Sequence, residues 1–209
     1  MGCLIGGRLA RGGHHVSFIA RGAQLAALRA HGLTLNSAQD HWQGAVNATD
    51  DATTLGAQDA VILCTKAYQL DGAVAHLAPL LDENTLVVPA VNGVPWWYFN
   101  QHGGEFDGRT LANLDPNGVL AKAVETKRII GCVNYLAGTL TQPGHVHYVH
   151  ELERRIVIGE LNGAITPRLE RLAAAFADGG FAPVMSEDIR QNIWHKLWGN
   201  IAFNPISAL

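Results

Sequence analysis

Three polar residues near the end of the chain, Lys196, Asn200 and Asn204, follow one another at intervals of four. In a helix, successive members of this set would be displaced by only about 40° and would form one polar stripe about 12 Å long. Lysine supplies a charge and a proton, while asparagine can both donate and accept hydrogen bonds. The stripe could therefore hold a small, oxygen-rich anion, although a solvated helix face is the alternative for this spacing.

The residues around the stripe predict how its helix is placed. Apolar side chains crowd the neighbouring arc, which we expect to pack against a core. Pro205 disfavours the α conformation at Asn204, so this asparagine is expected at a kink or a helix end. The apolar arc consists of Ile193, Trp194, Leu197, Trp198 and Ile201.

Elsewhere, polar residues follow three apolar, strand-like runs directly: Arg21, Lys66 and Asn92. Helical patterns separate these runs, which predicts an α/β fold with a mostly parallel sheet and helices on both faces. Ligands of such sheets bind beyond the carboxyl ends of the strands, so the three residues are candidate site residues. The strand-like runs are residues 15–20, 59–65 and 85–91.

Two features near the N-terminus favour a dinucleotide. Gly2 begins a predicted helix over residues 2–11 and has the position of the last glycine in a G-x-G-x-x-G loop, whose first two glycines the sequence lacks. Arg21 stands where such folds carry an acid for a ribose hydroxyl or have an arginine nearby for a 2′-phosphate. An arginine favours NADPH over NADH, and a surface arginine in a turn is the alternative.

The remaining pattern predicts further elements. A helix is expected over residues 68–81, and residues 100–125 read as a long connection with one short helix. Residues 128–135 read as a strand, and residues 144–150 and 155–160 as two strands paired antiparallel at the sheet edge. Thr166 is expected to cap a helix that ends at Asp178, residues 181–185 form a last strand, and Ser186 caps the final helix.

Several classes of function are disfavoured by composition. The formal charge is −3, with 48% hydrophobic and 16% charged residues, which is typical of a soluble globular protein and not of a nucleic-acid binder. No apolar run reaches membrane-spanning length and no signal peptide is recognisable. The three scattered cysteines favour reduced thiols in the cytoplasm. No metal site is predicted, because His145 and His147 alternate onto one strand face and His150 onto the other.

The segment from Pro95 to Phe99 is an aromatic cluster beside the predicted site edge. It could wall a pocket, form an oligomer contact or belong to the core. Together with the connection over residues 100–125, it is expected to border the pocket.

With these residues placed, the sequence resembles the ketopantoate reductase family, the 2-dehydropantoate 2-reductases of pantothenate biosynthesis. The resemblance extends over nearly the whole chain, and its most specific part is Trp194–Asn204 with the lysine and two asparagines. It implies a Rossmann-like NADP-binding domain over residues 1–185, followed at 186–209 by the first helix of an all-helical substrate domain. The quoted motifs are Val16–Arg21, Cys64–Gln69, Val91–Gly93 and Asp188–Arg190 with Trp194–Ala208.

The resemblance also implies residue roles. Lys196 would be the general acid that protonates the developing alkoxide. Asn200 and Asn204 would hold the substrate, and Asn92 would lie between the nicotinamide and the substrate. Cofactor contacts are implied for Gly2, Arg21, Lys66, Asn92 and Ala137.

Against the family pattern, the first strand and most of the helical domain are absent from the sequence. The resemblance therefore implies a piece of a longer reductase that is inactive by itself, with an exposed sheet flank and an exposed apolar side on its last helix. The expected function is reduction of 2-dehydropantoate by NADPH in the cytoplasm, with a homodimer plausible. A related dehydrogenase of another 2-oxo or 3-hydroxy acid and a non-catalytic NADP-binding module are the alternatives.

Overall fold

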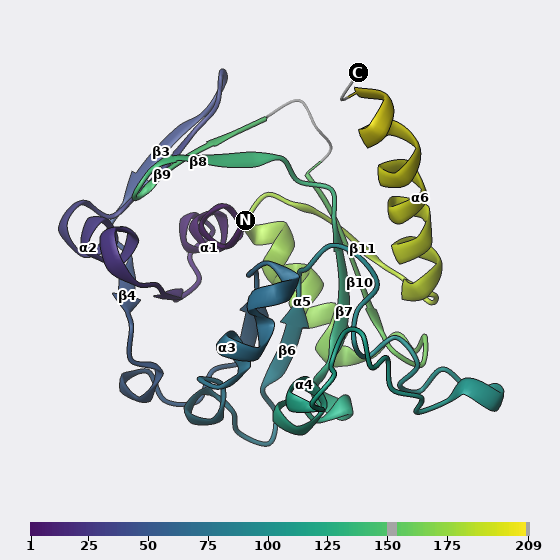
Figure 1. Ribbon diagram of the computed structural model, residues 1–209. Helices are drawn as coiled ribbons and strands as arrows, with labels where there is room; N and C mark the ends of the chain where they lie inside the picture. Colours follow the sequence, from purple (N-terminus) through teal and green to yellow (C-terminus); the bar gives the residue numbers. More distant parts are fainter. Residues whose placement is uncertain (150–153, 208–209) are drawn as a thin grey trace.

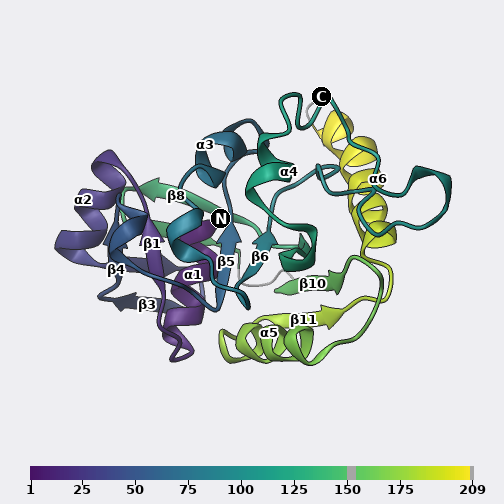
Figure 2. The same cartoon turned by 90° about the horizontal axis from the view of Figure 1, so that it is seen from below.

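The computed structural model describes residues 1–149 and 154–207, and for Asn204 it describes the backbone alone. Figure 1 shows strands at the centre with α5 on one side and α6 along the other, and Figure 2 shows the same arrangement from below. The helices are α1 Gly2–Arg11, α2 Gly22–His31, α3 Leu70–Val74, α4 Val119–Ala123, α5 Pro167–Asp178 and α6 Ile189–Ser207. The strands are β1 Ser17–Ile19, β2 Leu33–Asn36, β3 His41–Gly44, β4 Asn47–Thr49, β5 Ala60–Leu63, β6 Leu86–Pro89, β7 Ile130–Asn134, β8 Gly138–Gln142, β9 His145–Tyr148, β10 Arg155–Glu160 and β11 Ala182–Met185.

Parallel pairing dominates the part of the chain that was expected to bind a nucleotide. Strand β1 pairs with β4 and β5 with β6, both in parallel, and a parallel bridge from Val87 to Ile129 leads from β6 towards β7. Strand β10 then pairs antiparallel with β7 and parallel with β11. The predicted α/β, Rossmann-like class is confirmed. Among the described strands, the β1–β4 and β5–β6 pairs are not hydrogen-bonded to each other, which leaves a flank of each open.

The predicted antiparallel pair of residues 144–150 with 155–160 is wrong. Strand β9 instead pairs with β2 in parallel and with β8 in antiparallel, in a sheet that β3 completes. Strand β10 has no free edge for β9, because β7 and β11 occupy both of its sides. Strand β8 was not predicted at all, since its five residues are all exposed and show no apolar alternation.

Successive side chains of β10 point to opposite faces of the sheet and pack into two separate apolar clusters. Ile156 and Ile158 pack into the cluster that includes Leu172 and Phe176 of α5. Val157 points the other way, into the cluster beneath α6. Helices α5 and α6 therefore cover opposite faces of the β7–β10–β11 sheet, as Figure 1 shows.

The helix starts are set by local hydrogen bonds. Thr166 caps α5 as predicted, because its hydroxyl accepts from the backbone N–H of Leu169. The prediction that Ser186 caps the last helix is wrong. Its hydroxyl accepts from the N–H of Asp188 in a turn before the helix, and the Asp188 carboxylate accepts from the N–H of Gln191.

The helix expected over residues 68–81 is much shorter, since α3 covers only Leu70–Val74. A separate 3₁₀ turn follows at Ala78–Leu80. Pro79 lies within that turn and has no N–H to continue an α-helix.

Helix α6 buries less of its apolar arc than predicted. Ile193 is 6% exposed, but Trp194, Trp198 and Ile201 are 49%, 73% and 62% exposed. The side that faces the sheet carries Ile189, Ile193, Lys196 and Asn200, so the tryptophans point outward, as expected for an exposed apolar side. Of the two alternatives predicted at Asn204, the helix end is wrong, because α6 continues through Pro205 to Ser207, and the kink stays a prediction. None of the helices in the described residues has the length and apolarity needed to cross a membrane.

Candidate active site

Lys196 reaches from α6 to the carboxyl end of the parallel strands. Its Nζ donates to Oδ1 of Asn92 at 2.7 Å and to the backbone carbonyl of Asn134. Asn134 is the buried last residue of β7, and its own Nδ2 donates to the carbonyl of Ala90 at 3.3 Å. One helix and the ends of two strands thus meet at a single ammonium group.

The environment of Lys196 favours release of its proton. Burial lowers the pKa of the ammonium group, and the nearby Cys132 opposes this in part. No carboxylate lies among the pocket-lining residues that the structure describes. A lysine whose pKa is lowered in this way is better matched to proton transfer near neutral pH than a solvated one.

Asn92, Lys196 and Asn200 line one pocket. The spacing predicted that Lys196 and Asn200 share a helix face, whereas only the resemblance brought Asn92 to the same site. The free space in and around the pocket, open solvent at its mouth included, is about 390 Å³, and about 20 Å³ of it is available to the centre of a water molecule. A few convergent polar groups against apolar walls are typical of a small-molecule site. The side chain of Asn204 lies outside what the structure describes, so its substrate-binding role stays a prediction. The other lining residues are Pro89, Val91, Gly93, Pro95, Trp97, Cys132, Val133, Asn134, Ile193 and Leu197.

The aromatic segment contributes both to the pocket wall and to the core. Pro95 and Trp97 line the pocket, and the Trp97 side chain is 1% exposed within the core cluster under α6. No described residue of the 100–125 connection lines this pocket, so the expectation that this connection borders it is wrong.

The predicted cofactor residues at the N-terminal side lie apart from the Lys196 pocket. Arg21 lies two residues beyond β1 and Lys66 three residues beyond β5, and both are exposed. Gly2 begins α1 so close to β5 that a Cβ at this position would lie 3.3 Å from Cβ of Cys64. The first turn of α1 contains no acidic side chain. Exposed cations and a helix N-terminus are the donors that a phosphate-bearing cofactor requires, so the residues present fit such a group.

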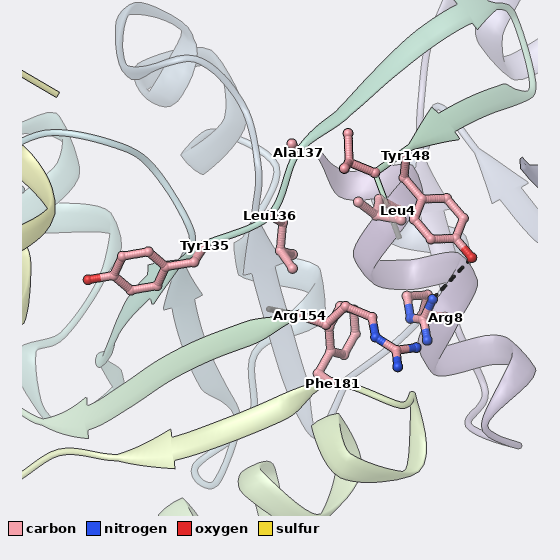
Figure 3. Close-up of a pocket in the computed structure, with 9 residues that line it drawn as sticks. Leu4, Arg8, Tyr135, Leu136, Ala137, Tyr148, Arg154 and Phe181 are labelled. Atoms are coloured by element: carbon pink, nitrogen blue, oxygen red, sulfur yellow. Dashed lines mark hydrogen bonds between the residues drawn. The ribbon is translucent and has the colours of Figure 1, made fainter. Parts of the chain in front are cut away.

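Ala137 lies in a different pocket, which Figure 3 shows together with Arg8, Tyr148 and Arg154. Arg8 is 5% exposed; its Nη1 donates to the hydroxyl of Tyr148 at 3.4 Å, and its Nε donates to the carbonyl of Gly179 at 3.0 Å. Sequence reasoning missed this buried arginine, and nothing in its helical spacing distinguishes it from a surface residue.

Three neighbours of Lys196 on β7 and just beyond it were also missed: Cys132, Asn134 and Tyr135. A polar residue within an apolar strand run was the signal that could have identified Asn134. Cys132 and Tyr135 carried no comparable signal, because a cysteine and a tyrosine are ordinary in a buried strand.

The histidines gather no metal site in the part of the chain that the structure describes, where no group of three His, Cys, Asp or Glu residues could hold an ion. His145 and His147 lie on β9, and His150 is outside the described residues.

Comparison with known proteins adds an independent observation. Residues 1–102 match the family model "Ketopantoate reductase PanE/ApbA". A 2-dehydropantoate 2-reductase of Mesorhizobium japonicum is 41% identical over 210 residues, covering 98% of this chain and 64% of the relative. A crystal structure from Ralstonia solanacearum, described as a candidate ketopantoate reductase, superimposes with a TM-score of 0.93 at 42% identity, covering 99% of this chain and 64% of that one. D-mandelate dehydrogenase, solved with NADH and anilino(oxo)acetate, shares the fold with a TM-score of 0.77 at 20% identity, over 96% of this chain and 58% of that one.

Proposed function

Because this chain belongs to the ketopantoate reductase family, we propose that it supplies the cofactor-binding part and the proton donor of an NADPH-dependent 2-oxo acid reductase. The proposed substrate is 2-dehydropantoate, reduced to pantoate in pantothenate biosynthesis. The chain spans 64% of the length of its Mesorhizobium relative, so the activity is that of the longer protein. A cytoplasmic location and a homodimer are parts of the same proposal.

One observation carries this proposal: Lys196, Asn92 and Asn200 line a single pocket at the carboxyl ends of the strands. The cofactor, when bound, supplies the hydride. Lys196 would hold its proton where the keto oxygen of the substrate gains negative charge, stabilising that oxygen before transferring the proton to it. Asn92 and the Asn134 carbonyl use two of the three Nζ–H donors, which leaves the third for the substrate.

The asparagines would orient the substrate. Asn200 lies one turn beyond Lys196 and would bond the carboxylate or the hydroxyl, with Asn204 proposed for the other end. The apolar wall of Pro95, Trp97 and Ile193 would exclude water and accept the branched carbon chain of the substrate.

The choice of NADPH rests on Arg21. The fold itself is shared with a dehydrogenase solved with NADH, so the fold does not select the phosphate. An exposed guanidinium two residues beyond β1 is suited to bidentate contact with a 2′-phosphate. Lys66, the N-terminus of α1 at Gly2 and Ala137 are the further proposed cofactor contacts.

The test is NADPH oxidation by the gene product that carries this sequence, with 2-dehydropantoate and a panel of other 2-oxo acids. We expect turnover with 2-dehydropantoate and a loss of about 10²- to 10⁴-fold in Lys196→Met. Undiminished turnover in Lys196→Met would refute the assigned role. Preference for another acid would support the related-dehydrogenase alternative, and NADPH binding without turnover of any acid would support the non-catalytic one.

A further inference from the structure

The ring of Tyr135 contacts two cations beside the candidate site. Its ring centroid is 5.6 Å from Nζ of Lys196 and 4.2 Å from the guanidinium carbon of Arg155. The residue comes directly after Asn134, whose carbonyl accepts from Lys196. Tyr135 also lines the pocket of Arg8 and Arg154, but Figure 3 shows its ring pointing away from these two arginines.

A backbone hydrogen bond attaches Tyr135 to the neighbouring strand. The N–H of Tyr135 donates to the carbonyl of Arg155 at 2.9 Å, which continues the β7–β10 pairing by one residue. The backbone that carries the ring is therefore anchored to the sheet, whereas Lys196 reaches the ring from α6 on a flexible side chain.

The groups that face Lys196 leave its charge weakly compensated. Asn92 and Asn134 offer neutral carbonyl oxygens. Burial raises the pKa of the Cys132 thiol to about 12, so it is uncharged at neutral pH. Arg155 on β10 is itself a cation, and the described residues that line the pocket include no carboxylate. Beside these groups, the face of the Tyr135 ring attracts the Lys196 ammonium group through its quadrupole.

We propose that Tyr135 is a positioning residue for Lys196: the tyrosine ring holds the ammonium group beside Asn92 and favours its protonated form. The protonation of Lys196 is a property of the protein without substrate. Only the consequence of this protonation for turnover rests on the proposed function.

The proposal assigns the effect on Lys196 to the aromatic ring of Tyr135 and not to its hydroxyl, so two variants are needed to separate these groups. Tyr135→Phe keeps the aromatic face, while Tyr135→Leu removes it but still fills the space and excludes water. Without the ring, the attraction to the Lys196 ammonium group is lost, so Lys196 loses its proton at lower pH.

The experiment is an NMR titration of protein labelled with ¹³C-lysine, with the Lys196 signal assigned from its absence in Lys196→Met. We expect the midpoint of Lys196 to fall by about 0.5 to 1 pH unit in Tyr135→Leu and to stay unchanged in Tyr135→Phe. Tyr98→Leu is the matched control, because Tyr98 bonds Trp194 on the same helix but does not contact Lys196. Thermal unfolding of each variant verifies that it is folded.

An unchanged midpoint in Tyr135→Leu, or an equal shift in Tyr135→Phe, would overturn the proposal. The titration needs no substrate, so its result does not depend on the proposed reaction. In a parallel measurement, the alkaline limb of the kcat/KM profile should move to lower pH in Tyr135→Leu, by the same amount as the NMR midpoint. A moved midpoint with an unmoved limb would support the positioning role and contradict Lys196 as the proton donor.

Discussion

The ammonium group of Lys196 donates to the side-chain oxygen of Asn92 at 2.7 Å, although 104 positions separate the two residues in the chain. This bond joins α6 to the carboxyl end of the parallel strands and defines the candidate site. Because its acceptors are neutral oxygens and no carboxylate is among the described residues that line its pocket, burial of the Lys196 ammonium group is costly.

The pH dependence of stability should reveal this cost. Burial lowers the pKa of Lys196 below its ordinary value of 10.5. Between the lowered value and 10.5 the unfolded chain binds more protons than the folded one, so the free energy of unfolding contributed by Lys196 rises with pH. The difference in unfolding free energy, wild type minus Lys196→Met, should therefore increase as the pH approaches 10.5.

Urea unfolding at a series of pH values measures this difference. Lys122→Met removes an exposed lysine and provides the comparison for loss of a surface charge. A difference for Lys196→Met that stays flat or falls with pH would mean that the ammonium group is not destabilised by burial.

Arg21 should determine the choice between the two nicotinamide cofactors. Arg21→Ala is expected to raise the KM for NADPH about 10- to 100-fold, since a charge-assisted contact to phosphate is lost, with little change for NADH. Arg29→Ala, at the other end of α2, is the matched control. Steady-state kinetics with both cofactors gives the answer, and equal changes for NADPH and NADH would exclude a 2′-phosphate contact.

Arg190 should be a major determinant of stability. Its guanidinium donates to the carbonyls of Tyr98, Leu161 and Asn100 at 2.6, 2.6 and 2.7 Å, which ties the first turn of α6 to two distant segments. Arg190→Met leaves these carbonyls without their donor and should lower the free energy of unfolding by about 2 to 4 kcal/mol.

The control for Arg190 is Arg171→Met, which removes an exposed arginine on α5 and should change the free energy of unfolding by less than about 0.5 kcal/mol. Chemical denaturation compares the two variants. A similar, small effect of both would show that the three carbonyls find water or other donors when Arg190 is removed.

Cys64 and Cys132 should resist alkylation in the folded protein. Burial raises the pKa of both thiols to about 12, so about one molecule in ten thousand carries the reactive thiolate at about pH 8. Mass spectrometry after brief iodoacetamide treatment should find both unmodified, whereas guanidinium-unfolded protein should react at all three cysteines. Rapid labelling of native Cys132 would show that the floor of the pocket is open to solvent.

The amino-acid sequence by itself determined most of the local structure. Apolar alternation and helical spacing identified β5, β6, β7 and β10, and the Thr166 cap of α5 follows from one hydroxyl and the next three residues. The spacing of Lys196 and Asn200 on one helix face and the resemblance to ketopantoate reductases also follow from the sequence. The strands, the helix cap and the helix-face spacing depend on neighbours within a few residues, so the order of the residues is enough to predict them.

Only the tertiary structure decided what meets across long distances in the chain. Strand β9 pairs with β2 and not with β10, because β7 and β11 pair with the two edges of β10. Nothing in residues 145–148 themselves indicates that these edges are taken. The contact of Lys196 with Asn92 and Tyr135, and the outward orientation of Trp198, depend on the angle at which α6 crosses the sheet. That angle is set by packing of whole surfaces, so a periodic pattern identifies the face that carries a residue but not the partner that the residue contacts.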